Sequence, residues 1–558
     1  MPNDTRYAAG LDYGTNSVRC LIVRAEDGAE IASAVAAYAS GEEGILLEAR
    51  NPDLARQHPR DYLDGTQKAV QAALELARQA DPAFEPARVA GIGIDATGST
   101  PLPIGPDHRP LAFQDRFANN LHAMAWLWKD HTATEEAASL TKQAKREHPE
   151  YLAKCGGTYS SEWFWAKMWH CARQAPEVSR AASHWIELSD WIPAVLTGTE
   201  SQPSRNRCAA GHKGLYHDAW GGYPSDSFLG GLHPELARFR KPLGGVRAKS
   251  MNEPAGRLTD PWAAQLGLPG GMPVAVGALD AHFGAVGSGI RPGVLVKILG
   301  TSTCDIMVAP LDPPLPDVPG LCGMVPGSVL PGYYGLEAGQ SAVGDLFNWW
   351  VHRIAPAGAT HDRLSMEAGQ LAPGESGLLA LDWNNGNRTV LADQRLTGLL
   401  LGQTLATRPA EIYRALIEAT AFGARMIMER FEDFGVRVEQ VVTCGGIAEK
   451  SPLVMQIYAD VTGRPMRISR SSQTCALGAA IAGAVVAGLH PSVPAACAAM
   501  TGVKSATYDP NPDSAQVYQE LFPLYRALHD AFGTSQTALD MGAVMKRLLE
   551  IRDRVRNL

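Results

Sequence analysis

The sequence GTNSVRCLIV, residues 14–23, has a counterpart in GTSTCDIMVA, residues 300–309, near the middle of the chain. Each copy begins G-T-x-[ST] and leads into an apolar run. Each also follows a strand-like stretch, AAGLDY before the first copy and GVLVKIL before the second. This order predicts a strand, a tight turn and a second strand in both places. Two such hairpins half a chain apart indicate a duplicated domain.

A longer pattern repeats around the two hairpins. Residues 58–77 predict a helix that begins near Pro59, and the strand-like RVAGIGIDATG follows from Arg88. In the second half, apolar residues keep helical spacing from Pro409 onward, and VEQVVTCGG then ends in two glycines. Proline is favoured in the first turn of a helix, which supports both starts. The sequence therefore predicts two α/β domains of the same construction, with the Gly-Thr turns facing each other across a cleft.

Size and composition restrict the class of protein. A chain of 558 residues is too long for one core. Its formal net charge of −8, without a basic run, argues against nucleic acid as a partner. We expect no secretory signal and no membrane span, because the apolar run at residues 475–489 is shorter than the roughly 20 residues a span needs. The nine cysteines include no CxxC pair, which favours free thiols in a reducing compartment. A cytoplasmic enzyme is the expected class.

The two turns suggest what the cleft holds. Turns of small residues expose successive backbone N–H groups, which suit phosphate oxygens, so two facing turns could hold a polyphosphate. Asp12 precedes the first turn. Its carboxylate would repel a triphosphate unless a cation lay between them, and Mg²⁺ is the expected cation. Asp12 could instead cap the turn as an Asx residue. The chain has no GxxxxGK[ST] phosphate loop, no protein-kinase HRD and DFG set, and no HExxH zinc motif.

Eight segments together resemble the FGGY family of carbohydrate kinases. They run in order from about residue 8 to residue 490: GLDYGTNSV, GIGIDATGSTPLPI, WLWKDHTA, CAAGHKGLYH, GALDAHFGAVGSG, KILGTSTCDIM, EAGQSAVGDLFNWW and CGGIAEKSPLVMQIYADVTGRPM. The phosphate turns are shared with the wider actin, sugar kinase and Hsp70 superfamily, so they indicate fold more than substrate. WLWKDHTA and CAAGHKGLYH point most specifically to the members that act on L-ribulose.

The resemblance implies an architecture. It implies two ribonuclease-H-like α/β domains of the actin, hexokinase and Hsp70 type, with an ATP and sugar cleft between them. The first domain would span residues 1–285 and the second residues 286–505, with a C-terminal helical extension over residues 506–558. Some face of the protein could form a homodimer contact.

The resemblance also implies an activity, namely ATP- and Mg²⁺-dependent phosphorylation of L-ribulose to L-ribulose 5-phosphate in L-arabinose breakdown. Asp280 would be the general base, and Asp12 would hold the metal through water. The sugar would contact Ala96, Lys213, Asp280 and Glu337. ATP would meet Gly14, Thr15, Asn16, Ser17, Gly300, Thr301, Ser302, Gly445 and Gly446.

Ordinary structural roles compete with these assignments. Asp280 follows a strand-like run and could cap the next helix, as could Glu337. Lys213 could be a solvated surface charge. Trp126 and Trp128 could line the sugar or pack in a core.

Two rival functions also remain open. One is a kinase for D-ribulose, a xylulose or another polyol. The other is an ATP-binding switch like actin or Hsp70, which would not need Asp280, Lys213 and Glu337 in one pocket.

Overall fold

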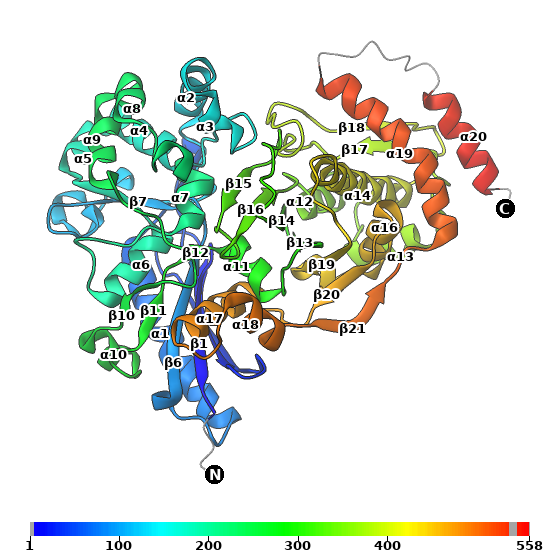
Figure 1. Ribbon diagram of the computed structural model, residues 1–558. Coiled ribbons are helices and arrows are strands. Elements are labelled where there is room, and N and C mark those ends of the chain that lie inside the picture. Colours follow the sequence, from blue (N-terminus) through cyan, green and yellow to red (C-terminus); the bar gives the residue numbers. More distant parts are fainter. Residues whose placement is uncertain (1–4, 535–543, 557–558) are drawn as a thin grey trace.

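The computed structural model describes residues 5–534 and 544–556. Within these residues, two seven-stranded sheets form the centres of two halves of the molecule (Figure 1). The first sheet contains β1 (Tyr7–Tyr13), β2 (Ser17–Arg24), β3 (Glu30–Ala37), β6 (Val89–Ala96), β10 (Pro254–Arg257), β11 (Pro273–Ala275) and β12 (Ala278–Leu279). The second contains β13 (Val294–Leu299), β14 (Thr303–Pro310), β15 (Gly323–Pro326), β16 (Tyr333–Ala338), β19 (Gln440–Cys444), β20 (Met466–Ser469) and β21 (Val503–Tyr508).

The predicted duplication of the hairpin is confirmed. Strands β1 and β2 are antiparallel, and the N–H of Gly14 donates to the carbonyl of Ser17 at 3.0 Å to close the turn. Strands β13 and β14 repeat this arrangement, with the N–H of Gly300 donating to the carbonyl of Ser302 at 3.0 Å. Beside each hairpin lies a parallel strand, β6 next to β1 and β19 next to β13. Both halves therefore present a small-residue turn at the same place in their sheet.

The long helices begin where their prolines predict. Helix α1 (Pro59–Ala80) packs on β2 and β3 and buries Tyr62, Val70 and Leu74, which recur at helical spacing. Helix α14 (Pro409–Asp433) is the equivalent element of the second half. Each of these helices precedes the parallel strand beside its hairpin, so the second repeat seen in the sequence is also structural.

Helix α17 (Thr474–Val486) joins the two halves. It belongs to the second half of the chain, yet it packs on β1 and β6 of the first sheet and on α11 (Asp280–Gly287) (Figure 1). Glycines permit this close approach. A Cβ at Gly10 would collide with the carbonyl of Ala476, and one at Gly478 would collide with the carbonyl of Phe283. The predicted buried helix in the 475–489 run is thus confirmed, and it anchors one half on the other.

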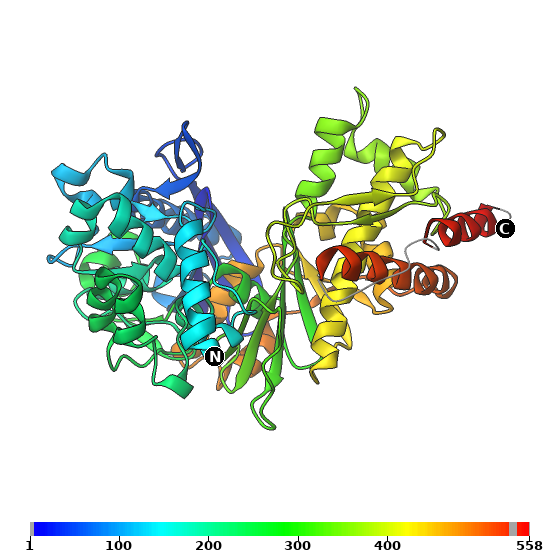
Figure 2. The same ribbon diagram turned by 90° about the horizontal axis from the view of Figure 1, so that it is seen from above.

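The halves also meet through α7 (Arg207–Gly214) and β15. A Cβ at Gly211 would collide with the side chain of Val325. The N–H of Met324 donates to the carbonyl of Lys154 at 3.0 Å. In the view from above, the blue-to-green first half lies on the left and most of the second half on the right, while orange segments of the second half reach the first (Figure 2). The two halves are therefore connected by packed elements in more than one place and not only by a linker.

The remaining elements cover the sheets. In the first half they are β4 (Leu46–Glu48), β5 (Asn51–Gln57), β7 (Pro101–Ile104), β8 (Ala125–Trp126), α2 (Thr134–Glu147), α3 (Pro149–Ala153), α4 (Phe164–Gln174), α5 (Pro176–Ala181), β9 (His184–Glu187), α6 (Leu188–Thr197), α8 (Asp226–Leu232), α9 (Pro234–Arg240) and α10 (Asp260–Leu266). In the second half they are α12 (Gly344–Trp349), α13 (His361–Gly369), β17 (Leu379–Leu381), β18 (Leu399–Leu401), α15 (Gly446–Lys450), α16 (Pro452–Thr462), α18 (Val493–Met500), α19 (Pro512–Gly533) and α20 (Val544–Arg556).

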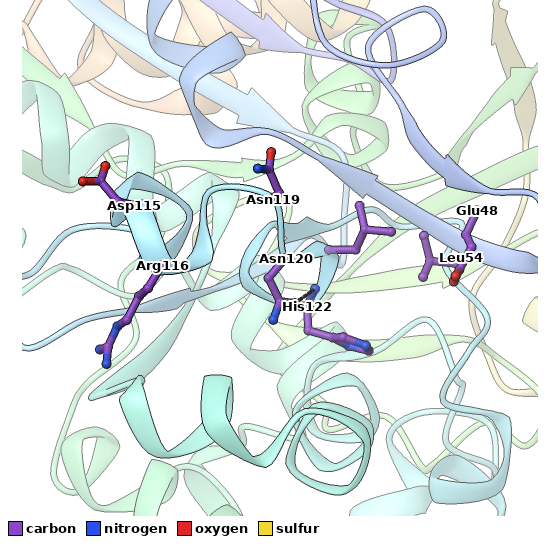
Figure 3. A pocket seen from close by; sticks show the side chains of 8 residues that line it. Glu48, Leu54, Asp115, Arg116, Asn119, Asn120 and His122 are labelled. Carbon is purple, nitrogen blue, oxygen red and sulfur yellow. Dashed lines mark hydrogen bonds between the residues drawn. The ribbon is translucent and has the colours of Figure 1, made fainter.

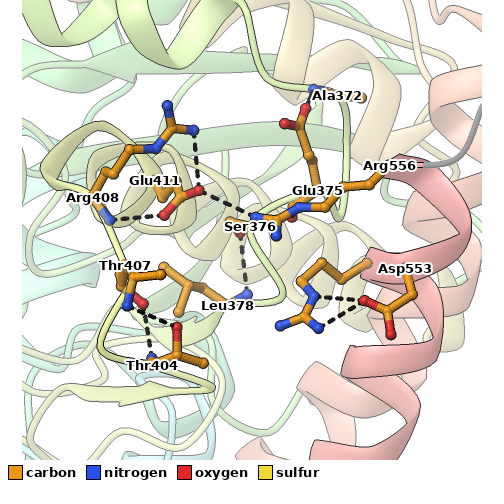
Figure 4. Close-up of polar contacts among 12 residues, drawn as sticks. Ala372, Glu375, Ser376, Leu378, Thr404, Thr407, Arg408, Glu411, Asp553 and Arg556 are labelled. Atoms are coloured by element: carbon orange, nitrogen blue, oxygen red, sulfur yellow. Dashed lines mark hydrogen bonds and ion pairs between the residues drawn. The ribbon is translucent and has the colours of Figure 1, made fainter.

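The C-terminal helices pack on the second half. Tyr518 of α19 is buried and donates to Glu418 at 2.8 Å. Arg556 of α20 donates to the carbonyl of Glu375 at 3.0 Å and lies 3.4 Å from the Glu411 carboxylate (Figure 4). Strand β21 crosses the expected boundary at residue 505 and adds to the second sheet. Of the expected extension over residues 506–558, residues 535–543 and 557–558 lie outside the described residues.

All nine cysteines are free, and all but Cys304 and Cys475 are buried. None of the described helices combines the length and the apolar character needed to cross a membrane.

Candidate functional site

Three carboxylates meet where neighbouring strands of the first sheet end. Asp12 of β1 is paired in register with Asp95 of β6, and β12 lies on the other side of β6 with Leu279 opposite Ala96. Asp280 follows Leu279 directly as the first residue of α11. Parallel strands bring their carboxyl ends to one edge of a sheet, which explains the gathering of residues so distant in sequence.

The clustering changes the acidity of all three groups. Burial raises the pKa of Asp280 to about 7, and the nearby Asp12 carboxylate adds to the shift while Lys213 opposes it. Burial also raises the pKa of Asp12, and it raises the pKa of Asp95 well above the usual range with help from Asp12 and Asp280. Neither buried Oδ atom of Asp95 has a hydrogen-bond donor among the described residues. A cation beside Asp12 and Asp95 would compensate this charge, so the pair fits a divalent metal.

Asp280 uses one of its carboxylate oxygens to bind the backbone at the start of α11, as a helix-capping role would require. Its Oδ1 accepts the N–H of Ala281 at 2.7 Å, while Leu279 occupies the cap position without a side-chain hydrogen bond. The other carboxylate oxygen has no such bond and stays available for proton transfer.

Lys213 and Glu337 form a buried ion pair between the two halves. Lys213 lies on α7 and Glu337 on β16, and Nζ is 2.9 Å from Oε1 and 3.1 Å from Oε2. Each residue is only 6% exposed. Burial alone would lower the pKa of Lys213, but Glu337 outweighs it and the pKa is raised. Burial alone would raise the pKa of Glu337, but Lys213 and its neighbours lower it. The surface-lysine alternative is wrong, and so is the helix-cap alternative for Glu337, since that residue lies inside a strand.

Two histidines beside this pair were not predicted. His212 Nδ1 lies 3.3 Å and His282 Nε2 lies 3.4 Å from Glu337 Oε2. Burial lowers the pKa of both, that of His282 to about 4, so both rings are neutral near pH 7. The three ligand atoms lie within 4.8 Å of one another, as in a metal site, but Lys213 already supplies the counter-charge. Their place next to Lys213 and two residues after Asp280 was the signal in the sequence.

The first turn is supported by hydrogen bonds to segments outside the hairpin. Trp128 Nε1 donates to Thr15 Oγ1 at 3.1 Å, and Asn16 Nδ2 donates to the carbonyl of Glu43 at 2.8 Å. Trp126, in contrast, is fully buried with the Arg56 guanidinium 3.4 Å above its ring. Trp126 therefore packs in a core, which was the alternative to lining the sugar.

The second turn is backed by the start of α12. The N–H of Val343 donates to the carbonyl of Thr301 at 2.8 Å, and that of Gly344 donates to the carbonyl of Gly300 at 3.1 Å. Ser302 completes the turn by accepting from Gly300.

The paired glycines after β19 lie beside the second turn. Gly445 has φ +96° and a Cβ there would collide with the carbonyl of Leu299, whereas a Cβ at Gly446 would meet nothing within 4 Å. The two glycines thus have different roles: Gly445 permits the chain to pass Leu299, and Gly446 faces open space next to the turn.

The acidic cluster and the strand before the second turn both lie near the α11–α17 contact. A Cβ at Gly284 of α11 would lie 3.2 Å from Cys475 Sγ and 3.5 Å from Ile298, two residues before the second turn. The Cys475 thiol in turn lies within electrostatic reach of Asp12 and Asp280, which add to the effect of burial in raising its pKa. The structure thus places the acidic cluster and the strand of the second turn on the two sides of one helix pair.

A separate open cavity of about 510 Å³ lies in the first half (Figure 3). It includes none of the predicted site residues. Its lining residues are Glu48, Leu54, Asp115, Arg116, Asn119, Asn120, Leu121 and His122.

Two domains of the same hairpin construction flank an acidic cluster, and comparison with known families specifies the class of protein. Residues 7–287 match the N-terminal domain of the FGGY family of carbohydrate kinases, and residues 295–487 match its C-terminal domain. The chain belongs to the FGGY family of carbohydrate kinases.

Individual relatives narrow the comparison further. The chain is 41% identical to a ribulokinase of Shouchella clausii (strain KSM-K16) and 41% identical to a ribulokinase of Mycolicibacterium smegmatis, in both cases over 99% of each chain. Among solved structures, a xylulose kinase from Rhodospirillum rubrum superposes with a TM-score of 0.78 at 24% identity, covering 94% of this chain and 99% of that one. The expected two-domain fold is confirmed.

Proposed function

We propose that this protein phosphorylates L-ribulose to L-ribulose 5-phosphate with ATP as the donor. The observation that carries the proposal is that α11, which begins with Asp280, brings His282 Nε2 to 3.4 Å from Glu337 Oε2, so Asp280 lies beside the Lys213–Glu337 pair. An ATP switch without sugar transfer would have no use for this combination. The choice of sugar is supported by the full-length similarity to ribulokinases.

In the proposed reaction, the turns at Gly14 and Gly300 hold the phosphates of ATP, and the adenosine lies against Gly446. Lys213 and Glu337 orient the sugar so that its 5-hydroxyl lies beside Asp280. Asp280 accepts the proton of this hydroxyl while the oxygen attacks the γ-phosphate, and a pKa of about 7 suits a base that works near neutral pH. Positioning and charge compensation supply most of the rate in such transfers.

Asp12 and Asp95 are the residues that would hold Mg²⁺, directly or through water. Asp95 is buried with both carboxylate oxygens unpaired among the described residues, and burial raises the pKa of the neighbouring Asp12, which suits a hard cation that prefers oxygen ligands. When bound, the ion neutralises charge on the phosphate oxygens. Asp12 would hold the ion through water, and Asp95 would provide a second carboxylate beside it.

A coupled ADP assay with L-ribulose, D-ribulose, D-xylulose and L-xylulose tests the proposal. We expect the highest kcat/KM for L-ribulose and little ADP formation without sugar. A preference for another ketopentose would move the assignment within the family. ATP consumption that does not depend on any sugar would contradict sugar transfer altogether.

The acidity of Asp280 predicts a pH profile. The base must be ionised to accept a proton, and its pKa is raised to about 7. We therefore expect kcat/KM for the sugar to fall as pH drops below about 7, by about tenfold per pH unit in the limit. Initial rates between pH 5.5 and 8.5 at low sugar concentration measure this limb. A profile that is flat down to pH 5.5 would contradict a base with a raised pKa.

Gly446 offers a test of the nucleotide side alone. A side chain there meets no protein atom within 4 Å, so Gly446→Leu should fold normally and occupy the space beside the second turn. We expect KM for ATP to rise by about tenfold or more, since the side chain displaces contact area of the adenosine. The sugar KM and the thermal midpoint should stay unchanged and serve as internal controls. An unchanged ATP KM would place the adenosine elsewhere.

A further inference from the structure

Arg388 is a charged side chain that none of the roles above uses. It is partly buried and lies in the segment 383–391 between β17 and β18. Its guanidinium makes no hydrogen bond or ion pair with any residue in the described ranges 5–534 and 544–556. A guanidinium carries five N–H donors and keeps its charge, so the donors of Arg388 are free to bind acceptor oxygens of a ligand.

The backbone on both sides of Arg388 is fixed to the second sheet. Thr389 Oγ1 accepts the N–H of Gly339 at 3.2 Å, and Asn387 Oδ1 accepts the N–H of Leu391 at 2.9 Å. Gly339 follows the end of β16, two residues after Glu337. Arg388 is thus held beside the strand end that carries one member of the buried ion pair.

Acidic groups of both halves act on Arg388. Burial alone would lower the pKa of Arg388, but Glu162 of the first half and Glu337 are among the groups that raise it. Burial raises the pKa of the Cys304 thiol to about 12, and the charges of Glu337, Arg388 and Asp280 also act on this pKa. The guanidinium therefore shares one environment with the sugar side of the site, and its strongest acidic neighbour is Glu162 from the opposite half.

We propose that Arg388 is a further sugar-binding residue, whose guanidinium donates hydrogen bonds to oxygen atoms of the ketopentose other than the reacting hydroxyl. The inference rests on the proposed function, because the ligand must be a polyhydroxylated sugar. Asp280 takes the reacting hydroxyl, and the Lys213–Glu337 pair satisfies much of its own charge. Arg388 then supplies donors that no other predicted sugar ligand offers from the second half.

Arg388→Met tests the inference, because it keeps the stem and removes every donor. A charge-assisted hydrogen bond to the ligand is lost, so we expect sugar KM and the calorimetric sugar Kd to rise by about 10- to 100-fold. ATP KM should stay within about twofold. Arg395→Met is the matched control, since Arg395 lies on the same loop and is 92% exposed. Arg388→Lys keeps the charge without the fork, and it should fall between the wild type and Arg388→Met. It carries the test if the Met variant does not fold.

A sugar Kd within twofold of wild type in Arg388→Met would overturn the inference, and so would a loss of kcat with sugar Kd unchanged. Glu162→Gln separates contact with sugar from a latch between the halves. If Glu162→Gln reproduces the whole effect and the double variant adds nothing, Arg388 acts through Glu162 and the inference fails. Wild type measured alongside distinguishes the proposals: if it phosphorylates no ketopentose, the proposed function fails, whereas active wild type with unaffected variants removes only the role of Arg388.

Discussion

Asp280→Asn is expected to lower kcat by about a thousandfold or more, because an amide cannot accept the proton of the attacking hydroxyl. In the wild type the N–H of Ala281 donates to Asp280 Oδ1 at 2.7 Å. The asparagine side chain has the same size, and its amide oxygen can still accept this hydrogen bond. Folding and ATP binding should therefore survive. Turnover with saturating sugar and ATP measures the loss, and nucleotide titration measures the binding.

Asp260→Asn is a matched control for this variant. Asp260 is the first residue of α10, just as Asp280 is the first residue of α11, but it is exposed and distant from the acidic cluster in sequence. We expect its activity to match wild type. Asp280→Asn with more than a tenth of wild-type turnover would remove Asp280 as the base and leave it as a helix-terminal residue.

Glu337→Gln is expected to damage both stability and sugar binding. Lys213 would keep its charge in a buried position without a counter-ion, and breaking such a pair costs about 3–5 kcal/mol. The apparent thermal midpoint should fall by several degrees. Sugar KM should rise by about 10- to 100-fold, because a carboxylate acceptor for hydroxyl donors is gone. Thermal unfolding and kinetics with varied sugar measure the two effects separately.

Two further variants make this prediction specific. Lys213→Met combined with Glu337→Gln leaves no unpaired charge, so its thermal midpoint should recover part of the loss while its activity stays low. Lys154→Met breaks another ion pair between the halves, with Asp317, but one that is much more exposed. It should cost less than about 1 kcal/mol. Equal losses in Glu337→Gln and Lys154→Met would contradict the buried, charge-paired state of Lys213.

Much of the fold could be predicted because its signals are local and occur twice. The hairpins at Gly14 and Gly300 follow from small-residue turns between apolar runs, and the starts of α1 and α14 follow from proline placed before helical spacing. The run at residues 475–489 could be recognised as a buried helix. Its packing on the sheet of the other half could not be predicted. The glycines that permit this contact, such as Gly10, are recognisable as contact residues only when both elements are seen together.

The residues of the candidate site also differ in how far the sequence could predict them. Asp12 could be proposed from the turn that follows it, whereas Lys213 and Glu337 could be proposed only through the family resemblance of the segments around them. His212 and His282 sit inside those motifs but were passed over, because a histidine shows its partner only in three dimensions. Arg388 lies in a glycine- and asparagine-rich loop that gives no periodic signal, and its nearness to Glu337 depends on the tertiary tie between Thr389 and Gly339.

The seat of α17 on β1 and β6 has a consequence for how the polypeptide becomes a working molecule. The strands of the first sheet are synthesised long before residues 474–486. One apolar face of that sheet is therefore exposed to solvent until α17 has been made. The N-terminal half alone would then expose an apolar surface that only α17 of the C-terminal half covers. We therefore expect the two halves to fold and unfold together in one cooperative transition. Cutting the gene between the two repeats would yield fragments that are competent only when they are produced together.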